Sequence, residues 1–201
     1  MIAVVDYGIG NLRSAEKALQ HLGADARLTT RASEIAQADA VVLPGVGNFG
    51  ACMHALRESA LEGVTVAAAG DGRPFIGICV GMQMLFDGSD ESPGVAGLGV
   101  VPGRITRLPD TVRLPQMGWN TLAVRSDARL VAGLPDPAWC YFVHSYAPEP
   151  DDGDVVAAWC EYGRRFAAAV ERGPLWATQF HPEKSGAVGL AMLGNFIAAA
   201  A

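Results

Sequence analysis

The chain has 201 residues with a formal net charge of −6, and half of its residues are hydrophobic. This composition excludes an intrinsically disordered chain, and the lack of a basic cluster argues against nucleic acid or an anionic membrane surface as a partner. No apolar run approaches the roughly 20 residues that a membrane-spanning helix requires, so the sequence predicts a globular, cytoplasmic protein without a membrane segment.

The first 80 residues alternate between short apolar strands and helices. The expected strands are 2–5, 25–29, 40–43 and 75–78. The expected helices are 12–22, a short helix capped by Ser33, and 51–61. This alternation predicts a three-layer α/β/α fold of the flavodoxin-like kind, with a mostly parallel sheet and a functional site outside the carboxyl ends of its strands. The glycine-rich turn at 6–11 lacks the pattern G-x-G-x-x-G, so no nucleotide site is predicted there.

A glycine-rich turn, P-G-V-G at 44–47, follows the expected strand 40–43. Such a turn can direct the backbone N–H groups of Val46 and Gly47 at an oxyanion, together with the N–H of Val80. An ordinary tight turn is the alternative interpretation, and this stretch by itself favours the ordinary turn.

The stretch 74–86 contains the pattern G-x-C-x-G, in which Cys79 stands between Gly77 and Gly81 at the end of an apolar run. This is the thiol counterpart of the G-x-S-x-G nucleophile elbow, a sharp strand-to-helix turn that presents the nucleophile to a substrate. A sulfur at a helix N-terminus is favoured as thiolate, which is the nucleophilic form. The alternative is a buried structural cysteine, and the pattern alone does not decide between them.

Beyond residue 86 the pattern changes. Residues 87–99 are expected to form a polar, glycine-rich loop, and strands with Pro/Gly turns follow. The expected strands are 100–107, 119–124, 139–146, 154–160, 166–171 and 174–180. They predict an antiparallel extension of the sheet, and a last helix is expected at 187–199. Because no linker or repeat interrupts the chain, a single domain is expected over 1–201.

The segment T-Q-F-H-P-E-K-S-G at 178–186 offers a base for the thiol. A thiol nucleophile needs a base, and the base needs an orienting partner. His181 and Glu183 are two residues apart, and Pro182 favours extended backbone before it, so both side chains can point the same way. The carboxylate can then hold one imidazole nitrogen while the other faces the sulfur. A surface turn with an incidental histidine is the alternative.

The other three cysteines, Cys52, Cys140 and Cys160, lie in helix-like or strand-like runs and are interpreted as small core residues. The spacing of the four cysteines is neither C-x-x-C nor typical of a metal site, so no metal and no disulfide framework is expected. The sequence therefore offers one candidate nucleophile rather than a metal centre.

Six stretches form a consistent set. They are D-Y-G-I-G-N at 6–11, P-G-V-G at 44–47, G-I-C-V-G-M-Q at 77–83, P-Q-M-G-W-N at 115–120, Y-F-V-H-S-Y at 141–146 and H-P-E-K-S-G at 181–186. Together they resemble the class I (triad) glutamine amidotransferases, and in detail the family of glutaminase subunits of imidazole glycerol phosphate synthase. The resemblance covers nearly the whole chain. It implies hydrolysis of L-glutamine through a thioester on Cys79, with His181 and Glu183 completing a triad and with no metal or organic cofactor.

The resemblance also places substrate contacts at Gln83, at Glu91 and at the backbone around Ser145 and Tyr146. Glu91 would meet the amine of the substrate. A polar helix residue is the alternative for Gln83, and a solvated acid is the alternative for Glu91. His144 is expected to be a core or interface histidine rather than a second base.

A free glutaminase would waste glutamine, so the resemblance implies a partner. This partner is a (β/α)8-barrel cyclase subunit, which forms a heterodimer with the glutaminase and consumes its ammonia to make imidazole glycerol phosphate and AICAR in histidine biosynthesis. By resemblance, Asn11, Trp119 and Tyr141 lie near that interface, although core packing explains the two aromatic residues equally well. Ligand at the partner would switch on the glutaminase through the peptide at 45–47.

Three other functions stay open at this point. The chain could be a glutaminase subunit for anthranilate or pyridoxal phosphate synthesis, a thiol hydrolase on the same fold, or a non-catalytic regulatory module. The P-G-V-G and H-P-E-K-S-G stretches favour histidine biosynthesis over the first. Unchanged glutamine hydrolysis after substitution of Gln83 would support the second, and the complete triad argues against the third.

Overall fold

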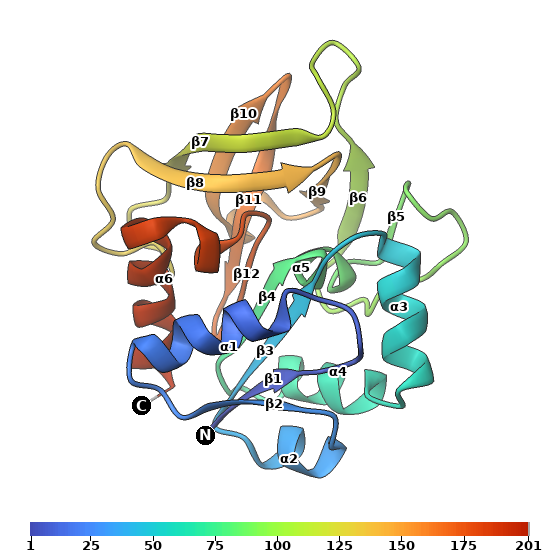
Figure 1. Ribbon diagram of the computed structural model, residues 1–201. Helices are drawn as coiled ribbons and strands as arrows, with labels where there is room; N and C mark the ends of the chain where they lie inside the picture. Colours follow the sequence, from blue (N-terminus) through green and yellow to red (C-terminus); the bar gives the residue numbers. More distant parts are fainter. Residues whose placement is uncertain (201) are drawn as a thin grey trace.

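A computed structural model describes residues 1–200 of the chain. The strands of its main sheet are β1 (Ile2–Val5), β2 (Ala26–Thr29), β3 (Ala40–Gly45), β4 (Phe75–Cys79), β7 (Gln116–Val124), β8 (Ala138–His144), β10 (Val156–Tyr162), β11 (Arg164–Arg172) and β12 (Leu175–Thr178). Within the described residues this sheet has nine strands, in the order β2-β1-β3-β4-β12-β11-β10-β7-β8 (Figure 1). A smaller sheet contains β5 (Gly88–Ser89), β6 (Gly103–Arg107) and β9 (Tyr146–Pro150), with β6 in the middle.

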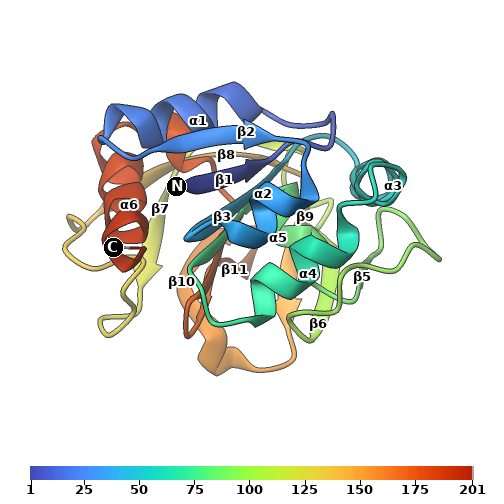
Figure 2. The ribbon, with the colours of Figure 1, turned by 90° about the horizontal axis from the view of Figure 1, so that it is seen from below.

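Helices cover both faces of the parallel part of the main sheet. They are α1 (Leu12–His21), α2 (Ala32–Gln37), α3 (Phe49–Glu58), α4 (Glu62–Gly70), α5 (Val80–Met84) and α6 (Gly186–Ala199). Short 3-10 turns lie at Gly153–Val155 and Pro182–Lys184. Helices α1 and α6 lie on one face, and α2 and α4 lie on the other (Figure 2). The expected α/β/α architecture, with a mostly parallel sheet and an antiparallel extension, is confirmed.

The central strands β3, β4 and β12 run parallel and end together. Gly45 pairs with Cys79 across β3 and β4, and Thr178 pairs with Ile78 across β12 and β4. All three strands are buried along their whole length, as expected for a sheet that is covered on both faces. The residues that follow these strands therefore meet at one edge of the sheet.

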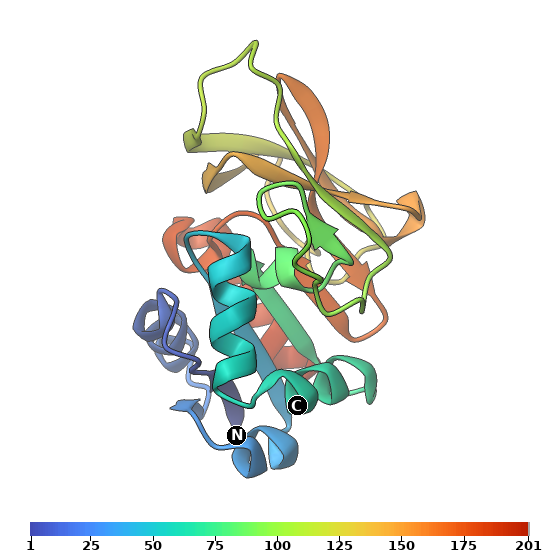
Figure 3. The same ribbon diagram turned by 90° about the vertical axis from the view of Figure 1, so that its right-hand side faces the viewer.

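The antiparallel strands continue the sheet from β12, and β7 and β8 lie above the edge where β3 and β4 end (Figures 1 and 3). Phe142 of β8 packs edge-on against Phe166 of β11 and against Phe180, with ring centroids 6.0 Å and 5.6 Å apart. Because Phe180 directly precedes His181, this aromatic cluster fixes the course of the chain as it enters the edge region.

The expected helix 51–61 is wrong in its extent. Helix α3 ends at Glu58, Ala60 adopts a left-handed φ of 58°, and α4 follows as a separate helix that is absent from the expected elements. A left-handed residue with a side chain cannot continue a helix. Helix α4 consists mainly of alanine, valine and glycine, so it shows no polar stripe that would indicate it in the sequence.

Two further expectations differ from the structure. Arg31 is the N-cap of α2, so Ser33 lies inside the helix; the cap region is instead held by the Thr29 hydroxyl, which accepts the Arg31 N–H at 3.0 Å. The expected strand 139–146 is divided at Ser145 into β8 and β9. The division occurs because the chain changes sheets there: β8 pairs with β7, and β9 pairs with β6.

Candidate active site

Cys79 stands at the junction of β4 and α5 in a backbone conformation that few residues adopt. Its φ of 56° and ψ of −114° lie outside the regions that residues with a side chain favour. A Cβ on Gly81 would lie 1.9 Å from the Leu43 carbonyl oxygen, and a Cβ on Gly77 would lie 2.9 Å from the Gly81 carbonyl oxygen. The sharp strand-to-helix turn around Cys79 therefore requires both glycines of the G-x-C-x-G pattern.

The backbone of His181 is attached to the edge strand β8. Its N–H donates to the Tyr141 carbonyl at 3.1 Å. The Ser185 hydroxyl donates to the His181 carbonyl at 2.7 Å and accepts the Tyr141 N–H at 3.0 Å. Tyr141 of β8 therefore holds both backbone polar groups of His181. Its carbonyl accepts the His181 N–H directly, and its N–H is linked to the His181 carbonyl through the Ser185 hydroxyl.

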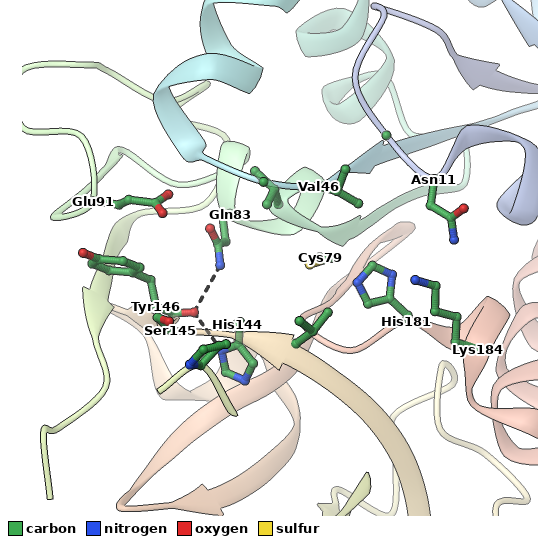
Figure 4. Close-up of a pocket in the computed structure, with 15 residues that line it drawn as sticks. Asn11, Val46, Cys79, Gln83, Glu91, His144, Ser145, Tyr146, His181 and Lys184 are labelled. Carbon is green, nitrogen blue, oxygen red and sulfur yellow. Dashed lines mark hydrogen bonds between the residues drawn. The ribbon is translucent and has the colours of Figure 1, made fainter. Parts of the chain in front are cut away.

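The imidazole of His181 lies beside Cys79 at the edge of the sheet (Figure 4). Its Nδ1 donates to Glu183 Oε1 at 2.8 Å, and both side chains are only 2% exposed. Burial lowers the pKa of His181, but the neighbouring Cys79 and Glu183 outweigh burial and raise the pKa to about 9. His181 is therefore a cation at neutral pH, held between a sulfur and a carboxylate.

Asn11 follows β1 and contacts the same carboxylate. Its Nδ2 donates to Glu183 Oε1 at 3.2 Å, and its Oδ1 accepts a hydrogen bond from the Ser14 hydroxyl at 2.8 Å. Glu183 Oε1 therefore accepts from His181 and Asn11 together. The structure brings Asn11, which the resemblance places near a partner interface, into direct contact with the His181–Glu183 pair.

The P-G-V-G turn is anchored by two side chains behind it. The Tyr7 hydroxyl donates to the Pro44 carbonyl at 2.7 Å, and the Cys52 thiol donates to the Val46 carbonyl at 3.2 Å. A planar trans peptide directs its C=O and N–H to opposite sides. The bond from Cys52 therefore also sets the direction of the next N–H, which belongs to Gly47.

Residues from several elements line one cavity of about 600 Å³ at this edge (Figure 4). The sequence-predicted residues in its lining are Asn11, Val46, Gly47, Cys79, Val80, Gln83, Glu91, Ser145, Tyr146 and His181. Glu183 contacts His181 but is not in the lining, and Trp119 and Tyr141 are outside it as well. The cavity occupies the position at which doubly wound sheets bind ligands, outside the carboxyl ends of the parallel strands.

Gln83 and Glu91 are both held by hydrogen bonds. Gln83 Nε2 donates to the Tyr146 carbonyl at 3.1 Å and to Gln179 Oε1 at 2.9 Å. Glu91 Oε2 accepts the N–H of Phe49, the first residue of α3, at 2.7 Å. A carboxylate that caps a helix while lining a cavity differs from the solvated acid that was the alternative for Glu91.

His144 also borders the cavity, but it is buried, and each of its ring nitrogens lies close to an oxygen atom. Its Nδ1 lies 2.8 Å from the Tyr146 carbonyl oxygen, and its Nε2 lies 2.9 Å from Gln116 Oε1. Burial is the main cause that lowers the pKa of His144 to about 4. A buried histidine whose ring nitrogens face a carbonyl oxygen and an amide oxygen, and whose pKa is lowered, fits the expected core role rather than that of a second base.

Several residues at the cavity have no role predicted from the sequence. They are Gly10, Pro115, Val143 and Lys184 in the lining, and Gln179 behind it. Gln179 and Lys184 belong to the segment at 178–186, so closeness to His181 in the sequence was the only signal for them. The others lie within the stretches 6–11, 115–120 and 141–146 that carry the resemblance, and the paths of β1, β7 and β8 bring them to the cavity.

The paired strands β7 and β8 present an exposed apolar surface, the β7–β8 face, formed by Met117, Trp119, Trp139 and Tyr141. Trp119 and Tyr141 are cross-strand partners whose rings meet edge-on, with centroids 6.0 Å apart. Met117, Trp119 and Trp139 are 66%, 54% and 48% exposed. Core packing, the alternative interpretation of Trp119, does not agree with this exposure.

Burial raises the pKa of the thiols of Cys52, Cys140 and Cys160, to about 12 for Cys140 and to about 11 for Cys160. These three cysteines are core residues, as expected. Within residues 1–200, no group of three or more His, Cys, Asp or Glu side chains is arranged to hold a metal ion. None of the helices in this described range combines the length and the apolar character needed to cross a membrane.

Comparison with known proteins gives a consistent set of matches. The glutamine amidotransferase class-I family matches residues 3–200. The chain is 49% identical over 200 residues to the imidazole glycerol phosphate synthase subunit HisH of Methanothermobacter thermautotrophicus, and the match covers 98% of each chain. It is 47% identical over 197 residues to the protein of the same name from Deinococcus radiodurans, covering 97% of this chain and 92% of that one.

The fold is similar to that of solved structures. PurLQS from Thermotoga maritima superimposes with a TM-score of 0.79 at 20% sequence identity, covering 98% of this chain and 97% of that chain. At this level of identity the likeness concerns the fold alone.

Proposed function

The chain belongs to the glutamine amidotransferase class-I family, and from this premise we propose that it is the glutaminase subunit of an imidazole glycerol phosphate synthase. Identity of 49% with a HisH subunit, over nearly the whole of both chains, supports this choice among amidotransferases. The observation that carries the chemistry is the arrangement of Cys79, His181 and Glu183 at one cavity edge.

The first step is attack by the sulfur. We infer that the sulfur attacks as the thiolate, the nucleophilic form of a cysteine, beside the His181 imidazolium, whose pKa is raised to about 9. The thiolate forms a bond to the side-chain amide carbon of L-glutamine, and the electrons of the C=O bond move to oxygen. Backbone N–H groups of Val46, Gly47 and Val80 stabilise that oxyanion.

The second step releases ammonia. His181 donates its proton to the amide nitrogen, the carbon–nitrogen bond breaks, and a γ-glutamyl thioester stays on Cys79. His181 is then neutral and accepts a proton from water as the water oxygen attacks the thioester. Cleavage of the carbon–sulfur bond releases glutamate and restores the thiolate–imidazolium pair, which Glu183 stabilises throughout.

Four residues bind the rest of glutamine in this proposal. Gln83 and the backbone of Ser145 and Tyr146 contact the substrate, and Glu91 pairs with its α-ammonium group. Support for this assignment comes from the common cavity and from the bond between Gln83 and the Tyr146 carbonyl. Glu91 Oε2 accepts the Phe49 N–H, so we assign Oε1 to the ammonium group.

The partner is a (β/α)8-barrel cyclase subunit that forms a heterodimer with this chain and uses its ammonia. The β7–β8 face supports this proposal because a large exposed aromatic surface is typical of protein interfaces. The partner's nucleotide ligand then activates glutamine hydrolysis through the peptide at 45–47. A cytoplasmic location stays a prediction.

The test measures glutamate release by the chain alone, with the cyclase, and with the cyclase plus its nucleotide substrate. We expect almost no activity alone and a large rise in the complete mixture. Cys79→Ala should abolish this activity, whereas Cys160→Ala, which removes a buried thiol on β10, should retain it. Activity that survives Cys79→Ala would overturn the mechanism, and full activity without cyclase would overturn the proposed gating.

A further inference from the structure

We propose that Gln179 is a catalytic residue whose side-chain N–H donates to the sulfur of Cys79 and stabilises its thiolate form. This inference rests on the proposed nucleophilic role of Cys79. It adds a group outside the Cys79, His181 and Glu183 triad, and it gives a function to a polar side chain that is completely buried.

Strand register places Gln179 opposite the nucleophile. Strands β4 and β12 are parallel neighbours in which Ile78 pairs with Thr178. The next residues of the two segments are Cys79, which ends β4, and Gln179, which directly follows β12. Gln179 Nε2 lies 3.8 Å from Cys79 Sγ, within the range of a hydrogen bond to sulfur. The backbone N–H of Gln179 donates to the Ala168 carbonyl at 2.8 Å, which holds this residue beside β11.

A hydrogen-bond chain fixes which end of the Gln179 amide faces the sulfur. Gln83 Nε2 donates to the Tyr146 carbonyl at 3.1 Å and to Gln179 Oε1 at 2.9 Å. Because the Gln83 nitrogen can only donate, the oxygen of Gln179 must face Gln83. The NH₂ group of Gln179 is therefore directed at Cys79, and a rotated amide would place two donors against each other.

The environment makes this contact strong. Cys79 is 3% exposed and Gln179 is 0% exposed, and hydrogen bonds to an ionised partner in a buried site are stronger than those between neutral groups. The other titratable groups whose charges couple to the sulfur are His181, Tyr7 and Cys52. Among them only His181 carries positive charge, so the Gln179 N–H is a second, permanent source of stabilisation for the thiolate.

The test uses iodoacetamide alkylation of Cys79 in the full chain without a partner, between pH 4 and pH 10, with peptide mass spectrometry to identify the modified cysteine. Gln179→Met keeps an unbranched side chain but removes the donor. Gln179→Glu keeps the shape and places a carboxylate near the sulfur. Gln116→Met is the matched control, since it removes another buried amide that bonds His144 instead of Cys79.

We expect the pH of half-maximal alkylation to rise by about one unit in Gln179→Met, as loss of one hydrogen bond to a charged group predicts. The rise should be larger in Gln179→Glu, and Gln116→Met should follow the wild type. At high pH every thiol is ionised, so all variants should react at least as fast as wild type there. Slower reaction at every pH would indicate a purely structural role and would overturn the inference.

An unchanged alkylation profile in both Gln179 variants would also overturn the inference, while leaving the proposed function intact. Failure of the proposed function is recognised separately, because glutamine hydrolysis by the assembled enzyme would then survive Cys79→Ala. Thermal melting of each variant shows whether it is folded. If only one of the two Gln179 variants folds, its alkylation profile alone tests the inference.

Discussion

Replacing Glu183 by glutamine tests whether this carboxylate raises the pKa of His181, because Glu183→Gln keeps the shape of the side chain and removes its charge. In the wild type Glu183 Oε1 accepts from His181 Nδ1 at 2.8 Å. The proposed mechanism needs protonated His181 when ammonia leaves, so activity is lost as the pH rises through the pKa of His181. Loss of the carboxylate destabilises the imidazolium and lowers this pKa, which moves the alkaline limb of the pH profile to lower pH.

The size of the shift follows from the contacts. The rise in the pKa of His181 from 6.5 to about 9 corresponds to about 3 kcal/mol of net stabilisation of the cation, at about 1.4 kcal/mol for each pH unit. Cys79 and Glu183 both contribute to it. A single charge-assisted hydrogen bond contributes about 1.5–3 kcal/mol, so the alkaline midpoint in Glu183→Gln is expected about one to two units below that of the wild type.

The assay is glutamate release by the assembled enzyme with ligand, measured from pH 6 to pH 10 at saturating glutamine. Glu58→Gln, on the exposed end of α3, is the control and should keep the alkaline midpoint of the wild type. An alkaline midpoint in Glu183→Gln equal to that of the control would refute the role of this carboxylate.

Stability gives a second measurement of the same quantity. Because the folded pKa of His181 lies above its ordinary value of 6.5, its protonation contributes stability below about pH 6.5, and this contribution is lost as the pH rises through about 9. In Glu183→Gln the decline in the free energy of unfolding between these pH values should be smaller. A decline of wild-type size would contradict the proposed interaction.

Substitutions at three further positions are expected to separate neighbouring roles. Asn11→Ala removes a donor to Glu183 and should lower kcat about tenfold with little change in the KM for glutamine; a change in cyclase affinity alone would instead favour the interface role expected from the resemblance. Cys52→Ala removes the donor to the Val46 carbonyl and should lower kcat about fivefold, whereas Cys52→Ser should retain most activity; equal kcat in the two variants would rule out this anchoring of the turn. Trp119→Ala should weaken cyclase binding at least about tenfold in titration calorimetry, while the alkylation of Cys79 in the isolated chain, followed by mass spectrometry, should not become slower. Unchanged affinity would exclude the β7–β8 face as the interface.

Part of this site could be predicted from the sequence because it depends on residues that are close together in the chain. The glycines on both sides of Cys79 are needed because the strand-to-helix turn brings backbone atoms too close for a Cβ, and that requirement is met within five residues. His181 and Glu183 are likewise two positions apart, so their contact depends on a short extended segment. Such short-range patterns can be recognised in the sequence without knowledge of the tertiary structure.

Helix α4 and the roles of Asn11 and Gln179 could not be predicted in the same way. Helix α4 is nearly all small or apolar and has no period that separates it from a loop or a strand. Asn11 and Glu183 are 172 positions apart, and Gln179 and Cys79 are 100 positions apart. Nothing local to any of these residues identifies its partner.

By itself, the sequence predicted the alternating α/β architecture, the sharp turn at Cys79 and the pairing of His181 with Glu183. Each of these depends on hydrophobic periodicity or on steric needs over a few residues. Only the tertiary structure decided which side chains surround them: Asn11 on the carboxylate, Cys52 behind the turn and Gln179 on the sulfur. These contacts arise from the order and register of strands in the sheet, and that register is set by packing over the whole molecule rather than by any one segment.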